Sequence, residues 1–132
     1  MSTAFHHSLD HVALNLDLRR PRTAASHLRS AFRHLYRLNA PDNLPPETGP
    51  WLNKSLVALS RADYRKAGIF LSEVTRQLPP TPSNQLLIEQ LTKLQFSLEQ
   101  NELPEAAQCL RAFNDAMREF RRNSQTTTDR PA

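Results

Sequence analysis

Three histidines and an aspartate lie within seven residues in the stretch FHHSLDH, at positions 5–11. His7 and His11 are four residues apart, so their imidazoles share one face if this stretch is helical. The same spacing occurs in helices that bind zinc through histidine nitrogens. A hairpin turn near residues 19–20 would bring His27, on the following helix, to the height of His11. The residue types at this point are therefore those of a candidate metal site.

Other features of the sequence argue against a metal. Asp10 and Asp17 fall on a different face from His7 and His11, and the single cysteine, Cys109, is far away in the chain. Histidines that pack in an interface or face solvent are commoner than histidines that bind a metal. We therefore predict no metal ion and no cofactor. A pH-sensitive interface is an alternative role, because unperturbed histidine titrates at about pH 6.5.

The helix that carries these histidines has two stripes at helical spacing. The first consists of Phe5, Leu9, Val12 and Leu16. The second, on nearly the opposite face, consists of His7, His11, Leu14 and Leu18. One stripe packs on the next helix, which leaves the other to be covered by a further helix or by a partner protein. We call the second set the histidine–leucine stripe and predict that it binds a partner.

Arginines are concentrated in one block, since residues 18–41 contain six arginines and no acid. On a helix that begins at Pro21, four of them fall on one face, opposite the apolar stripe. This arginine face consists of Arg22, Arg29, Arg33 and Arg37. Such a face is either simply solvated or binds the phosphates or carboxylates of a partner.

No set of residues supports catalysis. Cys109 has no neighbouring histidine in the sequence and stands beside Ala106 and Leu110, a setting typical of a structural thiol. Gly49 and Gly68 are the only glycines, so a glycine-rich loop that cradles phosphate is excluded. We expect a protein that is not an enzyme and has no catalytic residues.

The elements that position these residues are all predicted to be helices. Six stretches carry apolar residues at intervals of three and four, and none keeps the alternation of a strand. These stretches begin at Phe5, Ala24, Trp51 or Leu52, Tyr64, Leu87 and Ala106. The proline-rich segments 40–50 and 79–83 separate the second helix from the third and the fourth from the fifth. Pro21, Pro82 and Pro104 fit first-turn positions, where a missing N–H costs little.

The six predicted helices pair into three hairpins with a common spacing. In each hairpin a leucine is followed after eight residues by an alanine, and after four more by a second leucine. The three sets are Leu16–Ala24–Leu28, Leu59–Ala67–Leu71 and Leu98–Ala106–Leu110. The small alanine lets two helices lie close together just past a tight turn. Each hairpin then leaves an apolar face that a neighbouring hairpin must cover.

The middle hairpin resembles a tetratricopeptide repeat. The residues that match this repeat are Trp51, Asp63, Tyr64, Ala67, Leu71 and Pro79. The third hairpin keeps Leu103, Ala106, Leu110 and Phe113. Lys54 and Ser55 replace the leucine–glycine pair of the repeat, and the alanines stand 43 and 39 residues apart, further than the usual period of about 34. The resemblance implies an α-solenoid-like protein-binding module, whereas a helical bundle of three hairpins gives nearly the same pattern.

We predict one all-α domain over residues 1–122, either an α-solenoid or a helical bundle, followed by a disordered tail over 123–132 that lacks an apolar anchor. No run of about 20 apolar residues occurs, which argues against a membrane span. The single cysteine and the lack of a signal peptide indicate a cytoplasmic protein.

The expected function is that of a protein-binding module such as an adaptor, a chaperone or a small regulator. The partner binds either the histidine–leucine stripe or a groove lined by the first helices of the hairpins, and the arginine face steers an acidic partner. A homodimer is a further expectation. The alternative is a nucleic-acid-binding regulator that uses the six arginines at 19, 20, 22, 29, 33 and 37. No aromatic side chains interleave these arginines to stack bases, which favours a protein partner.

Overall fold

The computed structural model describes the backbone of residues 3–43 and 45–129, and the side chains of residues 4–35, 45–82 and 84–119. In these ranges it contains six α-helices, one short 3₁₀ helix and no strand. The helices are α1 (Thr3–Asp17), α2 (Pro21–Asn43), α3 (Thr48–Ser60), α4 (Tyr64–Arg76), η1 (Pro82–Asn84), α5 (Gln85–Glu99) and α6 (Leu103–Asp129). The prediction of an all-α fold with six helices in three hairpins is confirmed.

Prolines stand near the starts of the helices, as the sequence predicts. Pro21 and Pro82 are the first residues of α2 and η1, and Pro104 is the second residue of α6. The end of α2 differs from the prediction, because the helix continues past Pro41 to Asn43. A proline so near the end of a helix removes only one of its last backbone hydrogen bonds, which limits the cost. Of the predicted disordered tail over 123–132, residues 123–129 belong to α6, and residues 130–132 lie outside the described residues.

The three hairpin turns share one backbone geometry. Each contains a non-glycine residue with positive φ, namely Arg19 at 54°, Ala62 at 61° and Asn101 at 59°. The amide of the next residue donates a hydrogen bond to the carbonyl five residues earlier, over 2.8 Å, 2.9 Å and 2.9 Å respectively. This is the Schellman motif, in which glycine is the usual residue at the positive-φ position. Identical turns place each Leu–Ala–Leu set in the same register.

The interior of each hairpin is built on these sets. All nine leucines and alanines of the three sets are at most 3% exposed. Ser55, at a position where the tetratricopeptide repeat has glycine, is buried and donates a hydrogen bond from Oγ to the carbonyl of Ala67 over 2.7 Å. This bond ties α3 to α4 inside the middle hairpin.

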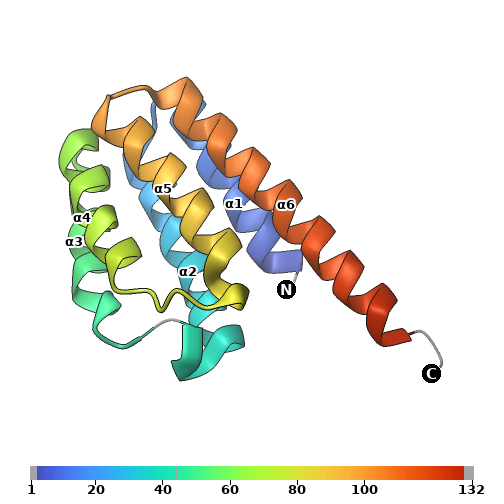
Figure 1. Ribbon diagram of the computed structural model, residues 1–132. Coiled ribbons are helices and arrows are strands. Elements are labelled where there is room, and N and C mark those ends of the chain that lie inside the picture. Colours follow the sequence, from blue (N-terminus) through green and yellow to red (C-terminus); the bar gives the residue numbers. More distant parts are fainter. Residues whose placement is uncertain (1–2, 44, 130–132) are drawn as a thin grey trace.

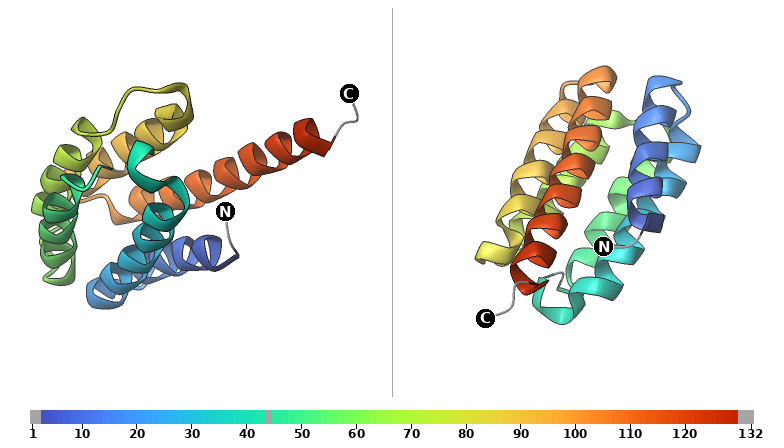
Figure 2. Two further views of the ribbon diagram at one scale, coloured as in Figure 1. Left: turned by 90° about the horizontal axis from the view of Figure 1, so that it is seen from below. Right: turned by 90° about the vertical axis from the view of Figure 1, so that its right-hand side faces the viewer.

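The helices pack in a ring that follows chain order. Each helix contacts the next, and α6 returns to pack on α1. Figure 1 shows α3 and α4 on one side of the molecule and α1 and α6 on the other. The view from below in Figure 2 shows the three hairpins arranged around a common interior. One hydrophobic cluster with residues from all six helices fills this interior. Because an open solenoid keeps its first and last helices apart, the contact between α1 and α6 favours a bundle.

Candidate functional site

An open hollow of about 240 Å³ lies between α2 and α3. It is lined by Arg29, Phe32, Arg33, Gly49, Leu52, Asn53 and Leu56. The three apolar residues among them are buried and form its floor, while both arginines and Asn53 are exposed at its rim. A Cβ at Gly49 would meet no atom within 4 Å, so the α3 side of the hollow is open. We call this feature the α2–α3 hollow.

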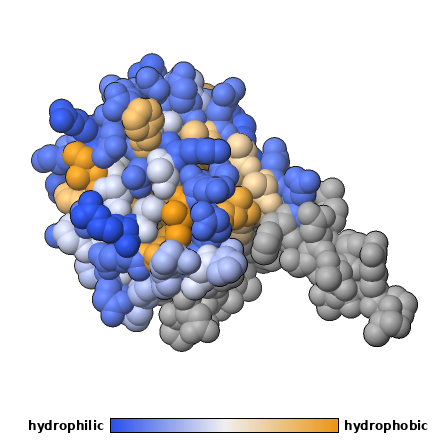
Figure 3. Space-filling model, viewed as in Figure 1, coloured by the Kyte–Doolittle hydropathy of each residue, from blue (hydrophilic) through white to orange (hydrophobic). Residues whose placement is uncertain are grey.

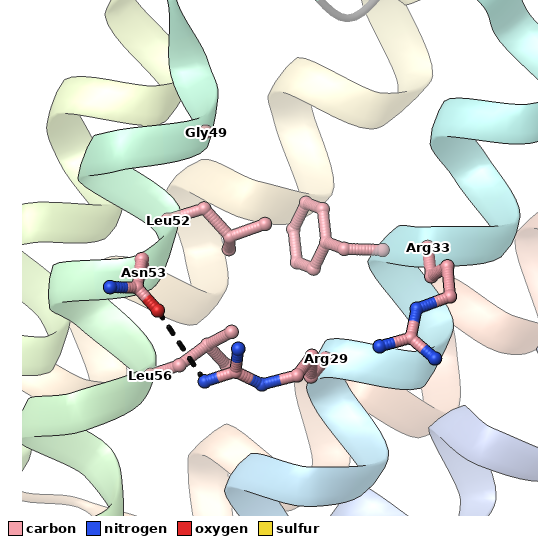
Figure 4. A pocket seen from close by; sticks show the side chains of 7 residues that line it. Arg29, Arg33, Gly49, Leu52, Asn53 and Leu56 are labelled. Atoms are coloured by element: carbon pink, nitrogen blue, oxygen red, sulfur yellow. Dashed lines mark hydrogen bonds between the residues drawn. The ribbon is translucent and has the colours of Figure 1, made fainter. Parts of the chain in front are cut away.

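Two guanidinium groups stand over the hollow on the α2 side. Arg29 reaches across it, and its Nη2 donates a long hydrogen bond of 3.5 Å to Oδ1 of Asn53 on α3 (Figure 4). Arg33 lies one helical turn further along α2. Neither arginine forms an ion pair with a carboxylate among the described side chains. The hollow therefore combines an apolar floor with two cations that have no acidic partner among the side chains that the structure describes.

Further cations lie near the α2–α3 hollow, and together with Arg29 and Arg33 we call them the basic region. A second hollow, at the turn end of α2 and α3, is lined by Arg20, Arg22 and Arg61 and has no acid among its lining residues. Arg61 also lines a third hollow between α3 and α4, together with Lys66 and Asp63. These two residues pair with each other at 4.0 Å. The basic region is therefore continuous from α2 to α4.

The arginine face predicted from the sequence forms part of this region. Arg22, Arg29 and Arg33 are exposed together on α2, whereas the side chain of Arg37 lies outside the described residues. Arg61 joins them from the turn after α3. The sequence gives no sign of this neighbour, because it depends on how the first hairpin packs on the second.

The histidine–leucine stripe lies at the surface. Leu14 and Leu18 are 47% and 50% exposed, and His7 is exposed as well. On the face of the molecule seen in Figure 3, hydrophobic residues form small groups separated by hydrophilic ones. The described residues of the chain therefore leave the two leucines of this stripe open to solvent.

Three imidazoles lie close together: those of His7 and His11, which belong to the stripe, and that of His27 on α2. The Nε2 atoms of His7 and His11 are 2.9 Å apart, and the ring of His27 stacks on that of His11 with centroids 4.7 Å apart and planes 19° apart. Burial lowers the pKa of His27, and the nearness of His11 and His7 lowers it further. We call these residues the histidine cluster. Within the described ranges, no three or more His, Cys, Asp or Glu side chains are grouped so as to hold a metal ion.

The remaining residues of FHHSLDH join α1 to α6. Asn114 of α6 is buried, and its Nδ2 donates to the carbonyl of His6 over 2.9 Å and to Oδ1 of Asp10 over 2.8 Å. Its Oδ1 hydrogen-bonds to Nδ1 of His6. Asp10 also pairs with Arg118 at 3.6 Å. His6 and Asp10 therefore close the ring of helices. The sequence alone does not indicate this role, because it depends on Asn114, which is 108 positions from His6 and 104 from Asp10.

The thiol of Cys109 has surroundings typical of a structural residue. The half-buried Cys109 has its Sγ 3.7 Å from Oγ of Ser97, which links α5 to α6.

No helix in the described part of the chain is both long enough and apolar enough to cross a membrane.

Known proteins give no further guide to these surfaces. No family model, curated protein or solved structure matches the chain with significant similarity.

Proposed function

We propose that the protein is a non-enzymatic binding module that takes an acidic, amphipathic segment of a partner protein in the α2–α3 hollow. The observation that carries this proposal is the apolar floor beneath two arginines that pair with no carboxylate in the described part of the chain. Apolar side chains of the segment contact Leu52 and Leu56, and its carboxylates meet Arg29 and Arg33. This is the helix-in-groove mode of recognition with a charged rim.

The arginines suit carboxylates for a geometric reason. A guanidinium group binds a carboxylate through two parallel hydrogen bonds, which are stronger than bonds between neutral groups. Arg29 gives up little when it turns to a ligand, because its bond to Asn53 is 3.5 Å long. The other cations of the region, Arg20, Arg22 and Arg61, raise the rate at which an acidic partner associates.

Nucleic acid is the competing partner, because the same cations attract phosphates. Proteins that bind single strands without sequence preference also offer aromatic faces on which bases stack. The one aromatic residue of the hollow, Phe32, is only 3% exposed and has no free face to offer. This burial favours a peptide over a nucleic acid as the occupant of the hollow.

Two double variants with equal net charge test the proposal. Arg29→Glu with Arg33→Glu reverses the two charges at the hollow. Arg65→Glu with Lys93→Glu reverses two exposed charges on α4 and α5, away from the hollow. Binding is measured by fluorescence anisotropy with short helical peptides that carry two leucines one turn apart beside glutamates. Peptides with lysine in place of glutamate serve as controls.

We expect the first variant to bind the acidic peptides at least about tenfold more weakly, because two charge-assisted contacts are lost. The second variant should lose less than about twofold, because its charges act only at long range. Equal losses in both variants would reduce the effect to net charge and reject the hollow as the site. Tighter binding of an oligonucleotide than of every acidic peptide, at the same salt concentration, would support the nucleic-acid alternative instead.

A further inference from the structure

The histidine cluster takes no part in the proposed peptide site and calls for an explanation of its own. His7 and His11 lie one turn apart on α1 with their Nε2 atoms facing each other at 2.9 Å. This distance is that of a hydrogen bond, so one hydrogen lies between the two nitrogens. A lone pair on one ring therefore points directly at the corresponding nitrogen of the other.

We propose that His7 and His11 form a two-histidine site for a divalent transition metal ion, such as Cu²⁺ or Zn²⁺, with water in the remaining coordination positions. The ring that donates the shared hydrogen changes tautomer, so that both Nε2 atoms present a lone pair, and the ion lies to one side of the line between them. Metal–nitrogen bonds of about 2.05 Å at a right angle put the two nitrogens about 2.9 Å apart, which is the square-planar preference of Cu²⁺. A tetrahedral angle, as for Zn²⁺, puts them about 3.3 Å apart. The spacing of the two nitrogens therefore suits either ion with little change, and each ring rotates to turn its lone pair from the other nitrogen toward the ion.

His27 acts on this site as a positioning residue. Its ring stacks on the ring of His11, with planes 19° apart, and thereby restricts rotation of that ring. It is not a third ligand, since no three ligating side chains are grouped around one point in the described structure.

The surroundings of the pair also suit a cation. His7 is exposed, so an ion reaches it directly from solvent. Residues 1–18 contain two acids and no lysine or arginine, so no cationic side chain of α1 opposes binding. Asp10 is held at α6 by Asn114 and Arg118 and leaves the histidine face to the two imidazoles.

Metal titrations of the full chain test this proposal. Calorimetry with CuCl₂ and with ZnCl₂, in a buffer that does not chelate metals, measures affinity and stoichiometry at slightly alkaline pH. Electron paramagnetic resonance of the Cu²⁺ complex counts the nitrogen ligands. The variants are His7→Ala, His11→Ala and His27→Ala. His34→Ala is the matched control, because His34 is another half-buried histidine of α2.

We expect one site that binds Cu²⁺ more tightly than Zn²⁺, in line with the usual order of affinities. His7→Ala and His11→Ala should each weaken binding at least about tenfold, and His34→Ala should leave it unchanged. His27→Ala should weaken binding by less than either ligand variant and keep the two-nitrogen spectrum, which separates positioning from ligation. Equal affinity in the parent, His7→Ala and His11→Ala proteins would overturn the proposal. Loss of a nitrogen signal in His27→Ala would overturn the two-ligand assignment.

Discussion

Gly68 lies where α4 closely approaches the backbone of α5. A Cβ at this position would lie 2.6 Å from the backbone oxygen of Gln95 and 2.8 Å from the backbone nitrogen of Glu99. Backbone atoms inside a helix cannot move aside one at a time, so any side chain here must push α4 away from α5. In the sequence, Gly68 is one of only two glycines, and its only use there is to help exclude a phosphate-binding loop. Its contact with α5 is not visible in the sequence, because that contact depends on how two hairpins pack.

Gly68→Ala should therefore lower the free energy of unfolding by about 1–3 kcal/mol, the usual cost of overpacking a tight contact. Urea denaturation followed by circular dichroism measures this change. Gly49→Ala is the control, because its new Cβ meets nothing within 4 Å. That variant should keep or gain stability, by up to about 1 kcal/mol, through the higher helix propensity of alanine. Equal loss of stability in both variants would contradict the role given to Gly68.

Ala62 is strained by the turn that it occupies. Its φ of 61° is the left-handed conformation, which costs a residue with a Cβ about 1–2 kcal/mol. Ala62→Gly should raise the free energy of unfolding by about 1 kcal/mol, measured by thermal unfolding, since glycine adopts this conformation freely. Asn101→Gly, at the equivalent turn with φ of 59°, should gain less, because asparagine tolerates the left-handed region better than alanine. A loss of stability in Ala62→Gly would refute this explanation.

The junction of α1 with α6 is the element-level feature that closes the molecule. Phe5 packs edge-on against Phe113 with ring centroids 6.2 Å apart, and Asn114 bonds to His6 and Asp10 beside it. The junction therefore combines an aromatic contact with a buried polar cluster. The cluster tolerates few substitutions, because each buried polar atom left without its partner costs free energy.

Asn114→Ala should lower the free energy of unfolding by about 1–3 kcal/mol, because it removes a buried amide that hydrogen-bonds to His6 and Asp10. Arg111→Ala, three residues earlier on the same helix, removes the exposed ion pair with Asp17 and should cost only about 0–1 kcal/mol. Urea denaturation of both variants gives the comparison. If the exposed ion pair proved the more costly of the two to remove, the buried cluster would not be what holds α6 to α1.

The hairpins were predictable from the sequence, while their arrangement was not. The Leu–Ala–Leu spacing reflects local turn geometry, which repeats at Arg19, Ala62 and Asn101. The arginine face was predictable for the same reason, since the periodicity of a single helix defines it. The α2–α3 hollow and the α1–α6 junction depend on contacts between hairpins, and residues such as Asn114 look like ordinary polar positions in the sequence. His27 is an intermediate case, since the expected turn was enough to place it beside His11.

At the scale of the whole molecule, charge is divided between two sides. Residues 19–82 hold eleven of the 17 Lys and Arg residues and four of the 13 Asp and Glu residues. Residues 83–119 hold three Lys and Arg residues and six Asp and Glu residues. Anions are therefore attracted to the side formed by α2, α3 and α4. α1, which carries His7 and His11, has no lysine or arginine, and its two acids pair with arginines of α6. The two proposed ligands, an acidic peptide and a metal cation, thus meet the molecule on different surfaces, of which only the first is strongly basic.

A closed ring of helices and an open solenoid differ in how the remaining helices should respond to the deletion of one hairpin. Deleting residues 1–44 removes α1 and α2 and uncovers both α3 and α6, which pack on them. In a closed ring around one core, the remaining four helices lose packing at two places. We therefore expect residues 45–132 alone to have reduced helical circular dichroism and no sharp thermal transition. In an open solenoid, the two remaining hairpins would keep their mutual interface and still unfold cooperatively.

The full chain supplies the reference for this deletion. Because all six helices share one cluster, its urea unfolding should be a single transition, with circular dichroism and the fluorescence of Trp51, the only tryptophan, changing together. Separate transitions would mean that the hairpins unfold as independent units. A cooperative transition in the fragment 45–132 would likewise speak for an open stack of hairpins. Loss of that transition on deleting the first hairpin would tie the stability of α3 and α6 to the closure of the ring.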